Sequence, residues 1–223
     1  MSRCNARRLL GCLTAPLALI AGATIADAQA GPVPLPPPVA VSQSEPGYGA
    51  LFEQRNALVA RQTAINRRRD DHNAVCLGIP ANNTSQIAWC RSDADAIGRE
   101  KGAYAKQLTV YNAYQAYYQG QTRYLRKDYS GAIPFYRQAM SFGVPIDTLM
   151  TEYYLSQARV AEKNGDMETA RARMCDINAY ETNRPSWLNF ELEQLFGQIR
   201  GWMKRHSRKF EVRTPTCALA DRG

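Results

Sequence analysis

Mostly apolar residues recur every seven positions in two neighbouring stretches of the chain. The first stretch has four of them, Leu51, Leu58, Ile65 and His72. The second has five, Cys90, Ile97, Tyr104, Tyr111 and Tyr118. An apolar repeat of seven is typical of long helices that pack along a narrow seam. We therefore expect residues 47–112 to form a coiled-coil-like hairpin of two antiparallel helices.

Turn-forming residues separate the two stretches and lie between two cysteines. Residues 77–85 include a glycine, a proline and a run of Asn, Thr and Ser, which are common in turns and helix caps. If Cys76 faces Cys90, the numbers of facing residues sum to 166. Leu58 then faces Leu108, so this register agrees with both apolar repeats. We therefore predict a Cys76–Cys90 disulfide, which stabilises a closed loop of about 15 residues by ~3 kcal/mol.

Cysteine and histidine counts bear on metal and cofactor binding. Beyond residue 30 the cysteines are Cys76, Cys90, Cys175 and Cys217, an even number that indicates two disulfides in an exported chain. Chain order favours pairing Cys175 with Cys217 among the three connectivities. A metal site needs closer cysteine pairs with matching histidines, and the two histidines are His72 and His206. We expect no metal or cofactor, and a packed or hydrogen-bonded His72 rather than a ligand or a pH switch.

The first 30 residues have the three parts of a secretory signal. Their basic residues are Arg3, Arg7 and Arg8. An apolar run over 9–25 follows, and Ala28-Gln29-Ala30 matches a small-residue cleavage site. A membrane anchor needs about 20 apolar residues, more than this run contains. We therefore expect residues 1–30 to be a cleaved bacterial-type signal peptide and the protein to be periplasmic or secreted. Residues 31–46, with six prolines, are expected to form a linker.

Small and large residues recur at matching intervals after the hairpin. The first set is Gly120, Ala132, Tyr136, Ala139 and Pro145. The second set is Ala158, Ala170, Met174 and Pro185. This pattern resembles the tetratricopeptide-repeat family, which implies stacked antiparallel helix pairs with a concave surface. The two sets are 38 residues apart rather than about 34, and Ile177 stands where the family usually has a small residue. A non-repeating helical bundle is the alternative.

A final amphipathic helix is predicted to cap the repeats. Its apolar face is Trp187, Leu188, Leu192, Leu195, Ile199, Met203, His206 and Phe210. Its basic end is Lys204, Arg205, Arg208 and Lys209. Positive charge at a helix C-terminus complements the macrodipole, and the excess permits contact with an anionic surface. The formal net charge is +8, and it becomes +6 when residues 1–30 leave with three Arg and one Asp. Residues 113–223 complete an expected all-α fold.

Tyrosines supply the candidate binding residues. Ten of the twelve lie between Tyr104 and Tyr154. Four of them do not fit a packing role and are expected to line a concave, partner-binding surface: Tyr114, Tyr117, Tyr124 and Tyr153.

No nucleophile-elbow, zinc-protease, phosphate-loop or dinucleotide motif occurs in the chain, so we expect no enzymatic activity. A carboxylate-based envelope enzyme is the enzymatic alternative. The expected function is an exported scaffold or adaptor that binds unidentified protein partners through the tetratricopeptide-like surface. Binding of anionic lipid or acidic polymer through the basic end is the alternative. Nucleic acid is not an expected partner, and self-association through the hairpin is a further hypothesis.

Overall fold

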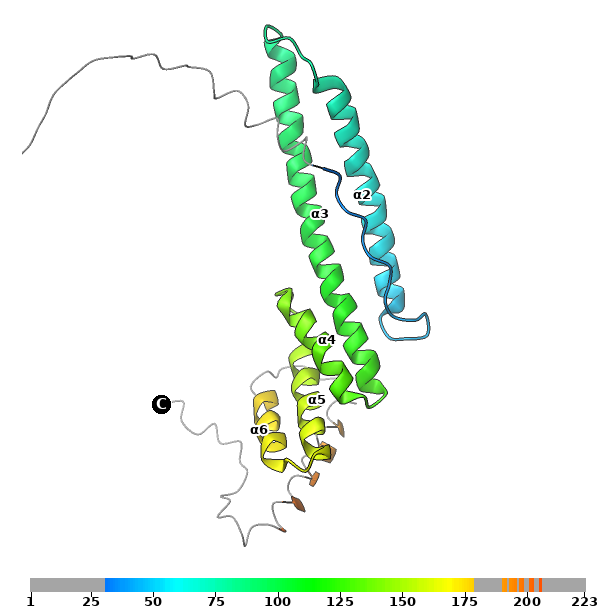
Figure 1. Cartoon of the computed structure of the whole chain (residues 1–223), viewed down its shortest axis with the longest axis vertical. Coiled ribbons are helices and arrows are strands. Elements are labelled where there is room, and N and C mark those ends of the chain that lie inside the picture. The colour runs from blue at the N-terminus through cyan, green and yellow to red at the C-terminus, as the bar shows by residue number, and fades with distance from the viewer. Residues whose placement is uncertain are drawn as a thin grey trace, which may run out of the picture. The chain divides into compact units, whose positions relative to one another are not determined.

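The computed structural model describes residues 31–178, together with 190, 191, 193–195, 197, 198, 201, 202 and 205. Its elements are α2 (Tyr48–Cys76), α3 (Thr84–Leu125), α4 (Tyr129–Ser141), α5 (Leu149–Lys163) and α6 (Met167–Asn178), shown in Figure 1. The described elements are all helices, so the predicted all-α class is confirmed. None of the described helices has both the length and the apolar character needed to cross a membrane.

Residue contacts divide the described chain into two compact units. The first unit contains residues 31–33 and 64–102. The second contains residues 34–63 and the described residues from 103 onward. Helices α2 and α3 contribute to both units, and each unit has its own buried side chains.

The first unit contains the loop end of the predicted hairpin. Ile65 and His72 of α2 are buried, as are Ala94 and Ile97 of α3. The predicted disulfide joins Cys76 to Cys90, with Cα atoms 5.9 Å apart. The disulfide therefore links the last residue of α2 to the second turn of α3 and closes the loop between them.

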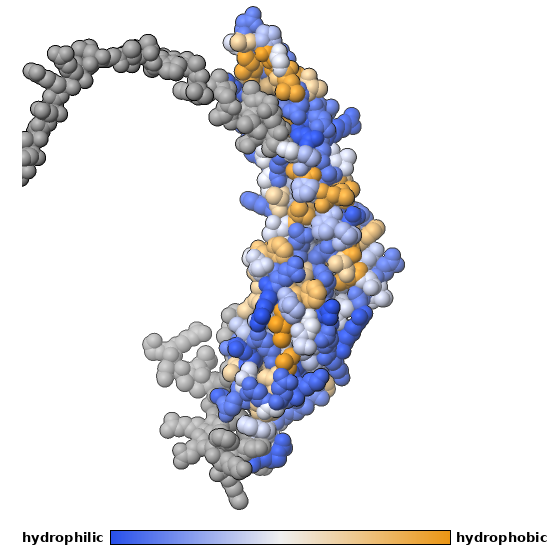
Figure 2. Space-filling view, in the orientation of Figure 1, coloured by the Kyte–Doolittle hydropathy of each residue, from blue (hydrophilic) through white to orange (hydrophobic). Residues whose placement is uncertain are grey.

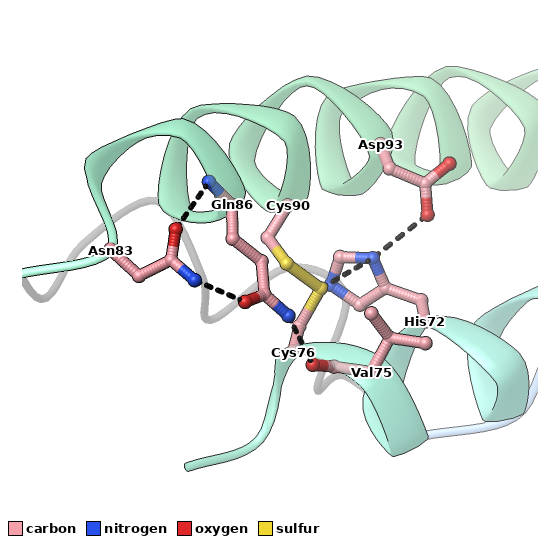
Figure 3. The surroundings of a disulfide bond; sticks show 7 residues. All are labelled: His72, Val75, Cys76, Asn83, Gln86, Cys90 and Asp93. Carbon is pink, nitrogen blue, oxygen red and sulfur yellow. Dashed lines mark hydrogen bonds and ion pairs between the residues drawn. A yellow bond between two sulfur atoms is a disulfide. The ribbon is translucent and has the colours of Figure 1, made fainter. Parts of the chain in front are cut away.

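The start of α3 is capped by the side chain of Asn83. The Gln86 backbone N–H donates to Asn83 Oδ1 at 3.2 Å, and Asn83 Nδ2 donates to Gln86 Oε1 at 2.7 Å. Gln86 also reaches back across the loop, where its Nε2 donates to the Val75 carbonyl at 3.4 Å (Figure 3). Together they satisfy one N–H at the N-terminus of α3 and one carbonyl in the last turn of α2, groups that helix ends leave unpaired.

The second unit contains the other half of the apolar seam. Leu51, Leu58, Tyr104 and Tyr111 are all buried, as the repeat of seven predicts. The register also agrees with the sequence. Arg61 is hydrogen-bonded to Gln107 in this unit, and His72 to Asp93 in the first unit. In each pair the two residue numbers add up to within two of 166, the value predicted for facing residues.

Helix α3 continues without a break through residue 112, where the expected hairpin meets the expected repeats. It ends at Leu125, and Lys127 makes the turn with a positive φ of 61°. Asp128 then caps α4 by accepting from the Gly131 N–H at 3.0 Å. The last turns of α3 therefore provide the surface on which α4 packs.

Small residues allow the helices of the second unit to approach closely. Ala132 and Ala139 of α4, Ala158 of α5 and Ala170 of α6 are fully buried. Large side chains fill the spaces between them, among them Tyr136, Leu155, Met174, Ile177 and Leu195. The alanines of the repeat pattern, with Tyr136 and Met174, are thus core residues, whereas Pro145 is exposed.

Gly120 packs closely against a core side chain and supports a test. A Cβ atom at Gly120 would lie 2.6 and 2.7 Å from two atoms of the buried Tyr136 ring. We expect Gly120→Ala to lower the free energy of unfolding by about 1–3 kcal/mol, because the added methyl group would overlap a ring that is fully buried in the core. The matched control is Gly102→Ala, where no atom lies within 4 Å. Better helix propensity should raise stability there by up to about 1 kcal/mol. Equal effects in urea unfolding would contradict this assignment.

Candidate functional site

The proline-rich segment packs against the hairpin, so the expectation of a linker is wrong. The side chains of Val33, Pro36 and Val41 are buried, and Val39 is half-buried. Its trace, dark blue in Figure 1, lies along α2 and α3 before the chain turns into α2. Buried positions at 33, 36 and 39 match the three-residue repeat of a polyproline II chain.

Two tyrosines of α3 and one arginine of α2 bind the carbonyl groups of this segment. The Tyr104 hydroxyl donates to the Pro34 carbonyl, and the Tyr111 hydroxyl donates to the Pro37 carbonyl at 3.0 Å. Arg55 Nε donates to the same Pro37 carbonyl, also at 3.0 Å. Burial raises the pKa of both tyrosine hydroxyls, with Arg55 opposing the shift at Tyr111. The hydroxyls therefore stay protonated and act as donors.

Side-chain amides pair with the backbone of the segment in each unit. Gln115 Nε2 donates to the Pro38 carbonyl at 2.8 Å, and the Ala40 N–H donates to Gln115 Oε1 at 2.7 Å. In the first unit, the Val33 N–H donates to Asn66 Oδ1 at 3.0 Å, and Asn66 Nδ2 donates to the Val33 carbonyl at 3.4 Å. Each amide thus satisfies one donor and one acceptor of an extended chain.

The spacing of donors and acceptors explains the fit. Prolines have no N–H and cannot form a strand ladder, so their carbonyls need side-chain donors when they are shielded from water. Three residues of polyproline II advance about 9 Å, and seven residues of α-helix advance about 10.5 Å. Pro34 and Pro37 therefore match Tyr104 and Tyr111. We call Arg55, Tyr104, Tyr111 and Gln115 the docking strip.

An open groove lies on the other side of the α2–α3 seam. It has a volume of about 360 Å³ and is lined by Gln54, Ala57, Leu58, Lys106, Gln107, Val110 and Tyr111. At 100° per residue, Ala57 and Arg55 project on opposite sides of Leu58. The groove and the docking strip therefore lie on different sides of the seam and share one residue, Tyr111.

Apolar side chains are also exposed at the loop end of the hairpin, in the first unit. Val75, Leu77 and Trp89 are 47%, 61% and 51% exposed. Hydrophobic surface is visible at this end, near the top of Figure 2. One face of the Trp89 ring stacks against His72, with centroids 6.4 Å apart. The loop end thus has a backbone held by a disulfide and hydrogen bonds, together with exposed apolar side chains.

His72 is a hydrogen-bonded histidine beside the disulfide (Figure 3). Its Nδ1–H donates to Asp93 Oδ2 at 2.8 Å and lies 3.6 Å from Cys76 Sγ. Arg68 binds the other oxygen of Asp93 at 2.7 Å. Burial alone would raise the pKa of Asp93, but the hydrogen bonds from Arg68 and His72 outweigh it and lower that pKa. Among the described residues, no cluster of three or more His, Cys, Asp or Glu is arranged to hold a metal ion.

Two of the four candidate tyrosines are core residues, which corrects their expected place on an open surface. Tyr117 and Tyr124 are only 5% and 3% exposed. Tyr117 is held by hydrogen bonds inside the core, and the Tyr124 ring packs edge-on against Tyr129 at 5.3 Å. Tyr114 is half-buried, as is Tyr153, whose hydroxyl accepts from Arg137 Nε at 3.2 Å. The four therefore do not form one exposed surface.

A buried carboxylate, which the sequence analysis missed, holds Tyr117 in place. Glu152 of α5 is fully buried. Its Oε1 accepts from the Tyr117 hydroxyl at 2.9 Å and from Gln121 Nε2 at 3.1 Å, and its Oε2 accepts from the Tyr136 hydroxyl at 2.6 Å. Tyr117 also pairs with Thr148 at 2.6 Å. The cluster joins α3, α4 and α5, and its buried position gives it a structural role.

The stability of the second unit should depend on the ionisation of Glu152. Burial raises the pKa of this carboxyl above its ordinary 4.5, against the opposing effect of its hydrogen bonds. Between 4.5 and the raised value, the folded chain holds more protons than the unfolded chain. The stability of the native chain relative to Glu152→Gln should therefore fall as the pH rises through this window. Urea unfolding of both proteins across that pH range tests this, and a constant difference would contradict it.

The remaining predicted site residues lie mostly outside the described part of the chain. Of the basic cluster only Arg205 is described, and it is exposed; Lys204, Arg208 and Lys209 are outside. Cys175 lies in α6, but its expected partner Cys217 and residues 1–30 are outside as well, so the second disulfide, the signal peptide and the basic surface stay predictions.

The second unit thus has an occupied docking strip and an open groove. The docking strip forms hydrogen bonds with the backbone of the proline-rich segment. The groove is lined in part by apolar side chains. Comparison of the chain with protein-family models, with curated proteins and with solved structures finds no match.

Proposed function

We propose that this protein is an exported, non-enzymatic scaffold or adaptor that binds protein partners, with the groove between α2 and α3 as a contact surface. Export is supported by the signal-like sequence of residues 1–30. The single observation that carries the binding function is the open groove, in which the exposed Ala57 and Val110 lie beside polar side chains.

The chemistry of the groove supports contact with a protein side chain. Ala57, Leu58 and Val110 provide an apolar surface, and Val110 is 39% exposed. Gln54, Lys106 and Gln107 line the same groove with groups that can hydrogen-bond. An apolar centre with a polar rim is the usual composition of a protein interface. Burying the exposed apolar groups would favour binding by roughly 25 cal/mol per Å².

Site-specific photo-crosslinking in the native envelope tests the proposal. A photoreactive phenylalanine at position 110 is compared with the same residue at position 109. Thr109 is also exposed and lies on the same helix, but it points about 100° away from Val110. We expect position 110 to give a discrete adduct with another protein and position 109 to give none. Ala57→Lys, which fills the groove with a charged chain, should remove the adduct.

Two outcomes would contradict the proposal. Equal adducts at positions 109 and 110 would show that the groove has no special role. An adduct that contains only a second copy of this chain would make the hairpin a self-association surface rather than the partner site of an adaptor.

A further inference from the structure

We propose that the docking strip is a recognition site for a proline-rich segment of a partner protein, and that residues 34–40 of the chain itself occupy this site in the structure. The proposal does not depend on the groove, because Arg55, Tyr104 and Gln115 do not line it and Tyr111 contacts the segment through its hydroxyl. The occupant is an extended chain with prolines and with small apolar residues at every third position.

The hydrogen bonds from the docking strip go to backbone atoms of the segment and not to its side chains. Tyr104, Tyr111 and Arg55 bind carbonyl oxygens only. Gln115 binds one carbonyl and one N–H. A different chain with the same backbone geometry would therefore make the same hydrogen bonds.

The buried positions define the class of ligand further. Pro36 is fully buried, whereas its neighbour Leu35 is 58% exposed. The ligand therefore needs a small apolar residue at the position of Pro36 and tolerates others beside it. It also needs a residue other than proline at the position of Ala40, because that N–H donates to Gln115. Prolines elsewhere favour the extended form and lower the entropy lost on binding.

The chain's own segment competes with such a ligand. It is attached through residues 42–47, where Glu45 pairs with Arg126 and where Gly47 has a positive φ of 78° beneath the Tyr118 ring. A short covalent connection gives an effective concentration on the order of millimolar. A free ligand therefore binds well only after the segment is weakened, and a partner in the cell must displace it.

The test uses the chain from residue 31 to 223 with Pro36→Asp and Val41→Asp. These changes place charges at buried positions of the segment and leave the docking strip intact. The first probe is a fluorescent peptide with the sequence of residues 31–42, followed by anisotropy. The second probe keeps only the prolines and the apolar residues at every third position, with alanine or serine elsewhere. We expect both peptides to bind the variant at least tenfold more tightly than they bind the unsubstituted chain.

Substitutions in the docking strip provide the specificity control. Adding Tyr104→Phe and Gln115→Ala removes three hydrogen bonds and should weaken binding of both peptides at least tenfold. A third peptide, with aspartate at the position of Pro36, should not bind. Absence of binding, or binding that the strip substitutions do not change, would overturn the proposal. Binding of the first peptide alone would overturn it in favour of exchange between copies of this chain.

A second measurement needs no substitution in the segment. In the unsubstituted chain, the Ala40 amide donates to Gln115 and should give a protected NMR resonance. Millimolar unlabelled peptide of the second type should displace the segment and shift that resonance. A resonance that does not move at saturating peptide, with the peptide also unbound by anisotropy, would overturn the proposal.

Discussion

Replacing Cys76 and Cys90 together by serine is expected to lower the free energy of unfolding by about 3 kcal/mol. The disulfide closes a loop of 14 residues' separation, and a link of that length removes about 3 kcal/mol of chain entropy from the unfolded state. Both cysteines are buried at the loop end of the hairpin, next to His72. Urea unfolding followed by far-ultraviolet circular dichroism measures the change.

Reductant separates the effect of the covalent link from the effect of the serine side chains. Under full reduction the native chain loses the same link, so its stability should approach that of the double variant. A difference of about 3 kcal/mol that persists in reductant would show that serine packing, rather than loss of the disulfide, destabilises the variant.

Replacing Glu152 by alanine is expected to lower the free energy of unfolding by about 2–4 kcal/mol. The Tyr136 hydroxyl then loses its acceptor inside the core, and Gln121 loses one of its two partners. An unsatisfied buried donor costs about 1–3 kcal/mol, and the space left by the side chain adds to this cost. Urea unfolding measures the loss.

Glu152→Gln is the matched control for the alanine variant. The glutamine oxygen can still accept from one tyrosine, so we expect a smaller loss near neutral pH. Tyr136→Phe with Glu152→Leu removes a donor together with its acceptor and should be less destabilising than Glu152→Ala. If all three variants were equally destabilised, loss of packing and not loss of hydrogen bonds would be the cause.

The hairpin could be predicted because it depends on a periodic pattern of apolar residues and on turn residues that are close together in the sequence. Leu51, Leu58, Ile97 and Tyr111 are buried as the repeat of seven requires. A register that satisfied both repeats also placed the two cysteines of the loop opposite each other. The run of Asn, Thr and Ser around residue 84 indicated turn or cap chemistry, and Asn83 provides the cap of α3. Each of these features follows from residues within a few helical turns.

The docking of the proline-rich segment could not be predicted in the same way. Pro34 and Pro37 lie about seventy residues from Tyr104 and Tyr111 in the chain, and a proline-rich composition by itself is typical of a linker. The fit depends on matching a three-residue repeat to a seven-residue repeat, which becomes visible only when the two are side by side. The tyrosines, assigned to the seam, also donate their hydroxyls to this segment.

The sequence by itself determined the helical class, the hairpin, its register and its disulfide, because apolar periodicity and turn chemistry act over short distances. Only the tertiary structure decided which polar groups are buried and what satisfies them. Tyr117 and Tyr124 are amphipathic, so their burial depends on partners such as Glu152 in another helix. A proline carbonyl likewise finds its donor only when a distant helix reaches it. The docking strip is therefore defined by hydrogen bonds between residues that are far apart in the sequence, and local sequence patterns do not reveal such bonds.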